Sequence, residues 1–499
     1  MQLLGGFATI FNVQTLLLMV VGTFGGLVVG ALPGLSAFTA LAIMLPFTFG
    51  MDSVNGLCFL VAVYVGGCSG GLISAVLLGI PGTPASIATC FDGYPMAQQG
   101  KSKTALSAAI ISSFVGGIFG AIILSFLGPY IAKVALKLSS YDYFGIILFA
   151  LTTVSSLAGD NMVKGLIACL LGICLSCVGT DGLSSVYRYT FGITKLANGF
   201  SLVPVLIGLF AVSQIMANAR DKATTKALDF SNTNQNEGEK FTFRDYFKRI
   251  RMIIPVSLLG LVIGILPGLG GNISNLMAYS YAKKTSTHPE TFGTGNVDGV
   301  IASETANNAT VGGAMIILLT LGIPGDNATS IILAGFQMND IAPGPLLFKT
   351  QATLVYAILA AFVLANIMFF LMEYFGLSIF IKMLSIPSML LLPIVIVCCF
   401  VGSYCSNNNT LDILIMVIFG LVGYILKKHK YPLAPMVVGF ILSPLLELYL
   451  RRSLMKTDGH WLPIFSSPVA AICIFATIFT IAYTVYGMIK KKRVEEAKV

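Results

Sequence analysis

Two apolar blocks occur twice in this chain, once in each half, and this duplication constrains the fold more than any other feature. Gly26–Leu35 reads Gly-Leu-Val-Val-Gly-Ala-Leu-Pro-Gly-Leu, and Gly260–Leu269 repeats it almost unchanged. The shorter block Leu-Gly-Ile-Pro-Gly occupies Leu78–Gly82 and returns at Leu321–Gly325. Self-similarity of this kind indicates two copies of one structural unit. Because Pro-Gly pairs interrupt apolar segments at matching places, the pattern is typical of a binding site at the interface between two membrane repeats.

The composition places these blocks in a lipid bilayer. Hydrophobic residues make up 56 % of the chain and charged residues 10 %, with a mean hydropathy of +0.88, whereas roughly 25 % of a typical soluble chain is charged. We therefore expect an all-α polytopic integral membrane protein. Two inverted-topology repeats with broken helices or re-entrant hairpins, plus one extra C-terminal helix, would give about 12–15 membrane segments. The net charge of +9 is interpreted as loop charge that orients the helices, not as a nucleic-acid surface.

The apolar segments divide the chain into four regions. Most segments approach the ~20 residues that a helix needs to cross a bilayer. The segments 38–51 and 271–283 are shorter, and they predict half-helices or hairpin arms. The start of the chain, 1–14, carries no Lys or Arg, unlike a signal peptide, so it predicts a permanent first helix. The predicted regions are a first membrane repeat at 1–216, a basic cytoplasmic linker at 217–251, a second membrane repeat at 252–450, and an external loop, appended C-terminal helix and basic cytoplasmic tail at 451–499.

Basic residues in the loops predict which side of the membrane each loop faces. The linker, the loop 427–430 and the C-terminal tail are rich in Lys and Arg, so the positive-inside rule places all three in the cytoplasm. The first-half counterpart of 427–430 is the loop 179–201, which has few basic residues and is expected outside. Matching loops then face opposite sides, which predicts inverted repeats with a periplasmic N-terminus and a cytoplasmic C-terminus. Arg451 and Arg452 fall on the predicted outside and count against this arrangement.

The shorter repeated block predicts two helix tips that suit an anion. Gly79–Ser86 and Gly322–Thr329 each combine the end of an apolar helix, a Pro-Gly break, and small polar residues suited to capping a following helix. Free backbone N–H groups at a helix start, backed by the positive end of the helix dipole, attract anions. Two such tips meeting near the middle of the bilayer would bind a carboxylate. The alternatives are an extramembrane turn before an ordinary helix and, for the breaks at Pro33 and Pro267, kinks that help helices pack.

One acidic residue of the second half is a candidate for cation coupling. Glu304 opens a polar patch with Asn307 and Asn308, and an apolar run follows, so its carboxylate is expected at membrane depth. An ionisable residue at that depth predicts function, because burying its charge is costly. A carboxylate beside an anion-binding tip would repel a substrate anion unless a proton or Na⁺ is also present. The alternative is that Glu304 caps its helix at the membrane interface.

These arguments give two sets of candidate residues, with no catalytic and no metal-binding set. The cysteines, including Cys174 and Cys177, lie mostly in apolar segments and are expected to be packing residues. No cofactor is expected apart from a coupling cation, H⁺ or Na⁺. The coupling-ion candidates are Glu304, Asn307 and Asn308. The substrate-binding candidates are Pro33, Gly34, Ser36, Ser69, Ser74, Pro81, Gly82, Thr83, Ser86, Gly268, Asn272, Ser274, Pro324, Gly325, Asp326 and Asn327.

Three motifs make the chain similar to a known family. A glycine-rich motif lies at Gly260–Gly270, a Ser-Glu-x-Ala-Asn-Asn element at Ser303–Asn308, and a Gly-x-Pro-Gly-Thr-Pro element at Gly79–Pro84; the first copy of the glycine-rich motif has Ser36 at its last position. On these motifs the chain resembles the TctA family, the large membrane subunit of the tripartite tricarboxylate transporters. The resemblance implies a secondary active transporter that imports a carboxylate, a di- or tricarboxylate such as citrate, across the bacterial inner membrane. It also implies two partners, a small membrane subunit and a periplasmic substrate-binding protein.

Two other functions fit parts of the sequence. An intramembrane serine protease would use Ser69, which lies in a Gly-x-Ser-Gly pattern, but the nucleophile needs a base within hydrogen-bond reach. The histidines His288, His429 and His460 all lie in polar loops, so the sequence predicts no enzyme. An anion channel is the other alternative, because broken helices also build selectivity filters, although filters usually form at an oligomer axis.

Overall fold

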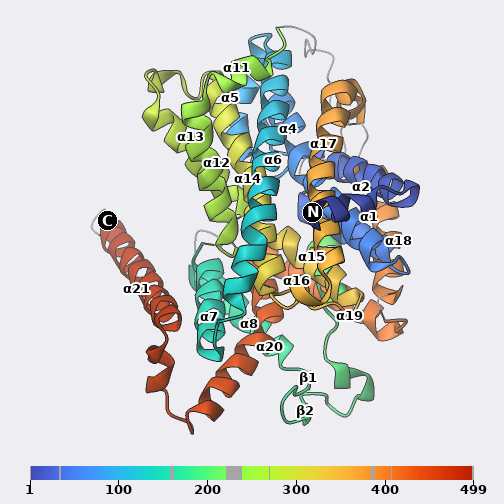
Figure 1. Cartoon of the computed structure of the whole chain (residues 1–499), viewed down its shortest axis with the longest axis vertical. Coiled ribbons are helices and arrows are strands. Elements are labelled where there is room, and N and C mark those ends of the chain that lie inside the picture. Colours follow the sequence, from blue (N-terminus) through green and yellow to red (C-terminus); the bar gives the residue numbers. More distant parts are fainter. Residues whose placement is uncertain are drawn as a thin grey trace.

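The computed structural model describes residues 2–32, 35–157, 162–220, 239–268, 270–383, 388–405 and 407–496. Within these ranges the chain is almost entirely helical, as the sequence predicts (Figure 1). The strands β1 (Gly179–Thr180) and β2 (Tyr187–Arg188) form a small antiparallel hairpin. The helices of the first half are α1 (Gln2–Ile10), α2 (Val13–Ala31), α3 (Ala37–Met44), α4 (Ser53–Leu78), α5 (Ile87–Gln98), α6 (Ser102–Ala135), α7 (Ser140–Leu157), α8 (Met162–Ser176), α9 (Leu202–Leu206) and α10 (Ser213–Arg220). Those of the second half are α11 (Phe243–Phe247), α12 (Ile250–Ile265), α13 (Gly270–Thr285), α14 (Val297–Leu321), α15 (Asn327–Met338), α16 (Leu347–Thr350), α17 (Ala352–Met383), α18 (Ser388–Cys405), α19 (Thr410–Lys428), α20 (Leu433–Lys456) and α21 (Pro468–Glu496).

Several helices have the length and composition of membrane spans. Six of them, within the described ranges, are long and apolar enough to cross a bilayer: α2, α4, α6, α17, α19 and α20. Shorter apolar helices accompany them, among them α3 and α12. The two segments expected to be short form α3 with the 3-10 turn that follows it, and α13. The chain is therefore a multi-pass membrane protein.

The two repeated blocks make the same contacts in each half. α2 packs against α4, and α12 packs against α14 in the same way. At the first crossing the Cα of Gly30 faces the backbone carbonyl of Gly67, and at the second Gly264 faces the carbonyl of Thr310. A Cβ atom at either glycine would collide with that carbonyl, so only glycine permits such a close approach. The repeated Gly-x-x-x-Gly-x-x-Pro-Gly pattern is thus a helix-crossing surface used twice.

The Leu-Gly-Ile-Pro-Gly blocks end the two central helices. α4 stops at Gly79, with a φ of 65°, and α14 stops at Gly322, with a φ of 72°. This left-handed conformation strains residues that carry a Cβ atom, so glycine is the residue that closes a helix here. The break then docks on the other block of its own half. A Cβ at Gly82 would lie 2.5 Å from the Gly30 oxygen, and one at Gly325 would lie 2.9 Å from the Gly264 oxygen.

α4 and α14 form the centre of the molecule. The apolar span of α4 is fully buried, and every residue of α14 between Gly299 and Thr320 is buried. Polar side chains on these helices therefore face protein, not lipid, and they need hydrogen-bond partners from neighbouring helices. The burial of α14 by neighbouring helices explains how this helix can carry the polar patch around Glu304.

The basic segment and the strand hairpin lie at opposite ends of the molecule. Figure 1 shows α11, from the basic linker, at one end and β1 and β2 at the other. At the hairpin end Arg451 contacts Asp181 at 2.8 Å and Glu447 at 2.5 Å, and Arg188 contacts Glu447 at 2.9 Å. Two carboxylates thus offset the charge of Arg451, the residue that counted against the predicted orientation. The cluster also joins the hairpin loop to α20.

The hairpin should loosen in acid, because Asp181 anchors it. The Ser184 hydroxyl, followed by the Arg451 guanidinium, holds the pKa of Asp181 well below its usual range. A lowered folded-state pKa means that the carboxylate stabilises the fold fully above about pH 5 and loses this effect as pH falls through about 4 and below. We expect the melting-temperature difference between the wild type and Asp181→Asn to stay constant from pH 6 to about pH 5 and then to shrink toward pH 3, as a thermal-unfolding series would measure. An equal difference at all pH values would contradict this role, and Asp458→Asn, at an exposed turn, is the control.

Candidate functional site

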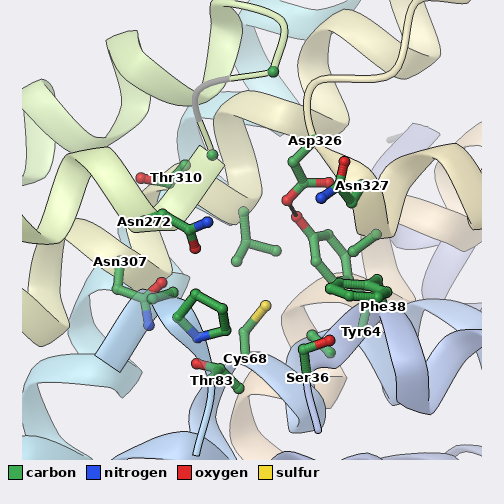
Figure 2. Close-up of a pocket in the computed structure, with 18 residues that line it drawn as sticks. Ser36, Phe38, Tyr64, Cys68, Thr83, Asn272, Asn307, Thr310, Asp326 and Asn327 are labelled. Atoms are coloured by element: carbon green, nitrogen blue, oxygen red, sulfur yellow. Dashed lines mark hydrogen bonds between the residues drawn. The ribbon is translucent and has the colours of Figure 1, made fainter. Parts of the chain in front are cut away.

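A cavity lies between the segments that follow the two Ile-Pro-Gly breaks, Thr83–Ala85 and Asp326–Ala328, and both halves of the chain line it (Figure 2). Its volume, measured for the centres of water-sized molecules, is about 80 Å³. This is room for several waters or for a small polar ligand, since one water centre needs roughly 10–15 Å³. The first half contributes Ser36, Ala37, Phe38, Tyr64, Cys68, Thr83, Pro84 and Ala85 to the lining. The second half contributes Gly268, Gly270, Gly271, Asn272, Asn307, Thr310, Val311, Asp326, Asn327 and Ala328.

The predicted residues divide into those that line the cavity and those that lie behind its wall. The lining includes Ser36, Thr83, Gly268, Asn272, Asn307, Asp326 and Asn327. Outside it are Ser69, Ser74, Pro81, Gly82, Ser86, Ser274, Glu304, Asn308, Pro324 and Gly325. Pro33 and Gly34 lie outside the described residues. A larger cavity of about 730 Å³ lies beside the strand hairpin, and none of the predicted residues lines it.

The helix tip of the second half already holds a carboxylate of its own. Asp326 is the N-cap of α15, and its Oδ1 accepts the Thr329 backbone N–H at 2.8 Å and the Thr329 hydroxyl at 2.8 Å. The Asp326 backbone N–H donates in return to the Thr329 hydroxyl at 2.9 Å, which completes a capping box. The Tyr64 hydroxyl on α4 donates to the other carboxylate oxygen at 2.6 Å. Asp326 therefore occupies the position that an external anion would take at this tip.

The helix tip of the first half is open. The 3-10 turn η2 (Pro84–Ser86) leads into α5, and Thr83, which precedes it, makes no side-chain capping bond. The Thr83 hydroxyl instead lies 3.2 Å from the Ser86 hydroxyl. Thr83, Pro84 and Ala85 all line the cavity. Amides at a helix start lack partners within the helix, so the two tips, alike in sequence, differ in chemistry: this one is free for an anion.

The opposite wall offers amide groups. Figure 2 shows Asn272 and Asn307 across the cavity from Asp326 and Tyr64. The Asn307 side chain interacts with the Glu304 carboxylate one turn away, although its buried Nδ2 makes no hydrogen bond of normal geometry with any residue that the structure describes. A ligand oxygen at this wall would give Nδ2 a better-aligned acceptor. The lining residues Tyr64 and Cys68 were not predicted, because they sit in an apolar run that carries no local polar signal.

Glu304 lies behind this wall, one helical turn from Asn307. It is fully buried and is the eighth residue of α14, whose N-cap is Asn296. The alternative that Glu304 caps its helix is therefore wrong. The Thr89 hydroxyl on α5 donates to Oε1 at 2.5 Å, and the Ser113 hydroxyl on α6 donates to Oε2 at 3.0 Å. Two helices, α5 and α6, thus each donate one hydroxyl hydrogen bond to this carboxylate.

A second buried carboxylate escaped the sequence prediction. Glu373 on α17 is fully buried, and its Oε2 accepts the Ser69 hydroxyl at 3.0 Å. The hydropathy pattern predicts an apolar helix over residues 351–372, which would leave Glu373 at the start of a loop. The structure continues α17 to Met383. An acidic residue followed by a further apolar stretch, 375–381, was the signal that could have found it.

The chain is similar to two proteins of Agrobacterium vitis and to one established family. Residues 16–438 match the family described as "Tripartite tricarboxylate transporter TctA family". An uncharacterized 52.8 kDa protein from the TAR-I ttuC' 3'region of Agrobacterium vitis is 32% identical over 489 residues, which is 98% of this chain and 96% of that protein. An uncharacterized protein from the TAR-II ttuC' 3'region of the same organism is 32% identical over 234 residues, 47% of this chain and 97% of that protein. The chain therefore belongs to the tripartite tricarboxylate transporter TctA family.

Proposed function

We propose that this protein imports a carboxylate, a di- or tricarboxylate such as citrate, across the bacterial inner membrane by secondary active transport. The observation that carries the proposal is the cavity between the two breaks. It combines a helix tip at which Thr83 makes no side-chain capping bond with the side-chain amides of Asn272 and Asn307 on the opposite wall. Such convergent donors in a buried cavity suit a carboxylate better than a cation or an apolar solute.

The charges around the cavity give a reason for cation coupling. Asp326 lies in the lining, and Glu304 lies one turn behind Asn307. A carboxylate substrate entering this space meets two negative groups in a medium of low dielectric constant, where repulsion is strong. A cation bound with the substrate would offset that repulsion. We therefore propose that H⁺ or Na⁺ binds at Glu304, with Asn307 and Asn308 shaping the pocket.

Alternating access would come from the two halves. Corresponding helices make corresponding contacts around the cavity, α2 with α4 and α12 with α14, which supports two inverted repeats that move against one another. In this arrangement the N-terminus is periplasmic and the C-terminus cytoplasmic. The separation of α11 from the strand hairpin supports the same orientation (Figure 1).

The family also suggests the partners. A tripartite system has further subunits, and we propose a small membrane subunit and a periplasmic binding protein that delivers the substrate. Transport is favoured over proteolysis because the Ser69 hydroxyl donates to Glu373, which leaves the serine without a histidine base among the described residues. Accumulation of solute against a gradient would separate a transporter from an anion channel.

A ligand screen tests the proposal on the purified protein. We expect di- or tricarboxylates to raise the melting temperature, while their neutral amides do not; saturation at 100 times Kd adds about 2.7 kcal/mol. Ala85→Trp, which fills the cavity beside the open tip, should remove the shift, and Phe126→Trp on the exposed face of α6 should keep it. Uptake that persists after all ion gradients collapse would overturn the coupled mechanism, and equal shifts with neutral amides would overturn the anion site.

A further inference from the structure

Glu373 and Ser69 form a buried pair whose chemistry is incomplete. Both residues are 0 % exposed, and the single hydrogen bond from Ser69 satisfies only Oε2 of the carboxylate. The other oxygen, Oε1, has no hydrogen-bond partner within the described part of the chain. An ionised carboxylate normally accepts several hydrogen bonds when it is buried, because losing its hydration is costly. With one hydrogen bond on Oε2 and none on Oε1, this site suits a neutral carboxylic acid better than an ionised carboxylate.

None of the ion pairs among the described residues involves Glu373. α17 packs against α1, α2, α4, α6 and the short α16, whose ionisable residue is Lys349. Lys240 lies 4.7 Å from the ring centre of the neighbouring Tyr374. α1 and α2 contain no ionisable side chain, and α4 contains only Cys58, Tyr64 and Cys68. The ionisable residues of α6 are Lys103, Tyr130 and Lys133, and neither lysine forms an ion pair with Glu373. The charged group that acts on Glu373 is Glu304, and its effect is repulsive.

The contacts favour a proton over a metal cation as the ligand of Glu373. A hard cation such as Na⁺ or Ca²⁺ is held by several oxygen ligands. Around Glu373 the described residues supply one hydroxyl, that of Ser69. Around Glu304 they supply the hydroxyls of Thr89 and Ser113. The two carboxylates are therefore different kinds of site.

Both carboxylates connect to the cavity lining through the central helices α4 and α14. Ser69 follows Cys68, which lines the cavity from α4, and Glu304 lies one turn from Asn307, which lines it from α14. We propose that Glu373, held by Ser69, is a proton-binding site that carries one proton per transport cycle, separate from the cation site at Glu304. A proton from the outer side adds to the carboxylate to form a neutral acid and leaves on the inner side, with no redox change. This inference rests on the proposed function.

Accumulation driven by an imposed pH gradient tests the inference in cells that make the chain together with its partner subunits. One coupled proton contributes about a tenfold accumulation ratio per pH unit. Glu373→Gln should therefore lower the ratio about tenfold at a gradient of one unit, while exchange of internal for external substrate continues. Glu290→Gln, at a side chain that is 68% exposed, should leave both unchanged. An unchanged ratio in Glu373→Gln would overturn the proton site.

A spectroscopic measurement keeps the inference independent of transport. The infrared carbonyl band of a protonated carboxylic acid, recorded in the purified wild type across a pH titration, should contain a component that Glu373→Gln removes. Ser69→Ala should shift that component, and Ser69→Thr should restore it, because threonine keeps the hydroxyl. If wild-type protein accumulates no carboxylate but the band behaves in this way, the proposed function fails while the proton site stands. Absence of the band at every pH would refute the site even where uptake occurs.

Discussion

Replacing Glu304 by glutamine is expected to remove the share of accumulation that the cation at Glu304 drives, while leaving substrate binding and the proton site at Glu373 intact. Glutamine has nearly the same shape, and the hydroxyls of Thr89 and Ser113 can rotate to donate or accept, so the fold should persist. What is lost is the buried negative charge that repels an incoming carboxylate. Substrate should then bind without its coupling cation. At a gradient of one pH unit, or an equivalent Na⁺ gradient, the accumulation ratio should fall at least about tenfold.

The diagnostic result is the separation of binding from accumulation. Melting-temperature shifts with carboxylate, measured with and without Na⁺ and at two pH values, should depend on the cation in the wild type and become independent of it in Glu304→Gln. Glu290→Gln removes an exposed carboxylate and serves as the matched control. If Glu304→Gln accumulates substrate at the normal level with the normal ion dependence, the assigned role is wrong.

Replacing Asp326 by alanine is expected to cost far more stability than replacing Thr83, although the two lie at corresponding tips. The alanine removes the N-cap of α15, worth about 1–2 kcal/mol, and leaves the Tyr64 hydroxyl without its acceptor, worth about 1–3 kcal/mol. Together this is about 2–5 kcal/mol. Thr83 makes no capping bond, so Thr83→Ala should change stability by less than about 1 kcal/mol and instead weaken carboxylate binding.

Graded variants separate the two contributions at Asp326. Asparagine is an equally good N-cap, so Asp326→Asn should retain most of the stability that Asp326→Ala loses. Tyr64→Phe removes only the hydroxyl that donates to Asp326, so it should lower the stability less than Asp326→Ala does. Thermal unfolding of the purified variants in one detergent provides the comparison. Equal losses in Asp326→Ala and Thr83→Ala would mean that the tips are equivalent, contrary to the structure.

The placement of charged partners could not be read from the sequence. Arg451 looks like a basic residue on the wrong side of the membrane, yet Asp181 lies 270 positions away along the chain and contacts it. Ser69 looks like a substrate ligand, and its hydroxyl instead contacts Glu373 on a helix that the hydropathy pattern ended too early. Neither contact could be read from the sequence, since a side chain's partner depends on which helices pack together.

The local features of the chain were determined by its sequence alone. Hydropathy requires membrane helices, because their backbone groups cannot stay unpaired in lipid, and the repeated glycines fix where helices cross and end, because only glycine permits those approaches and φ values. The capping box that holds Asp326 on one tip is also local, since Asp326 and Thr329 are three residues apart, whereas Thr83 at the other tip makes no side-chain capping bond. What the tertiary structure decided is which distant side chains reach these tips. The Tyr64 hydroxyl reaches Asp326 from α4 in the other half, a contact between segments far apart in the chain that no local pattern of residues encodes.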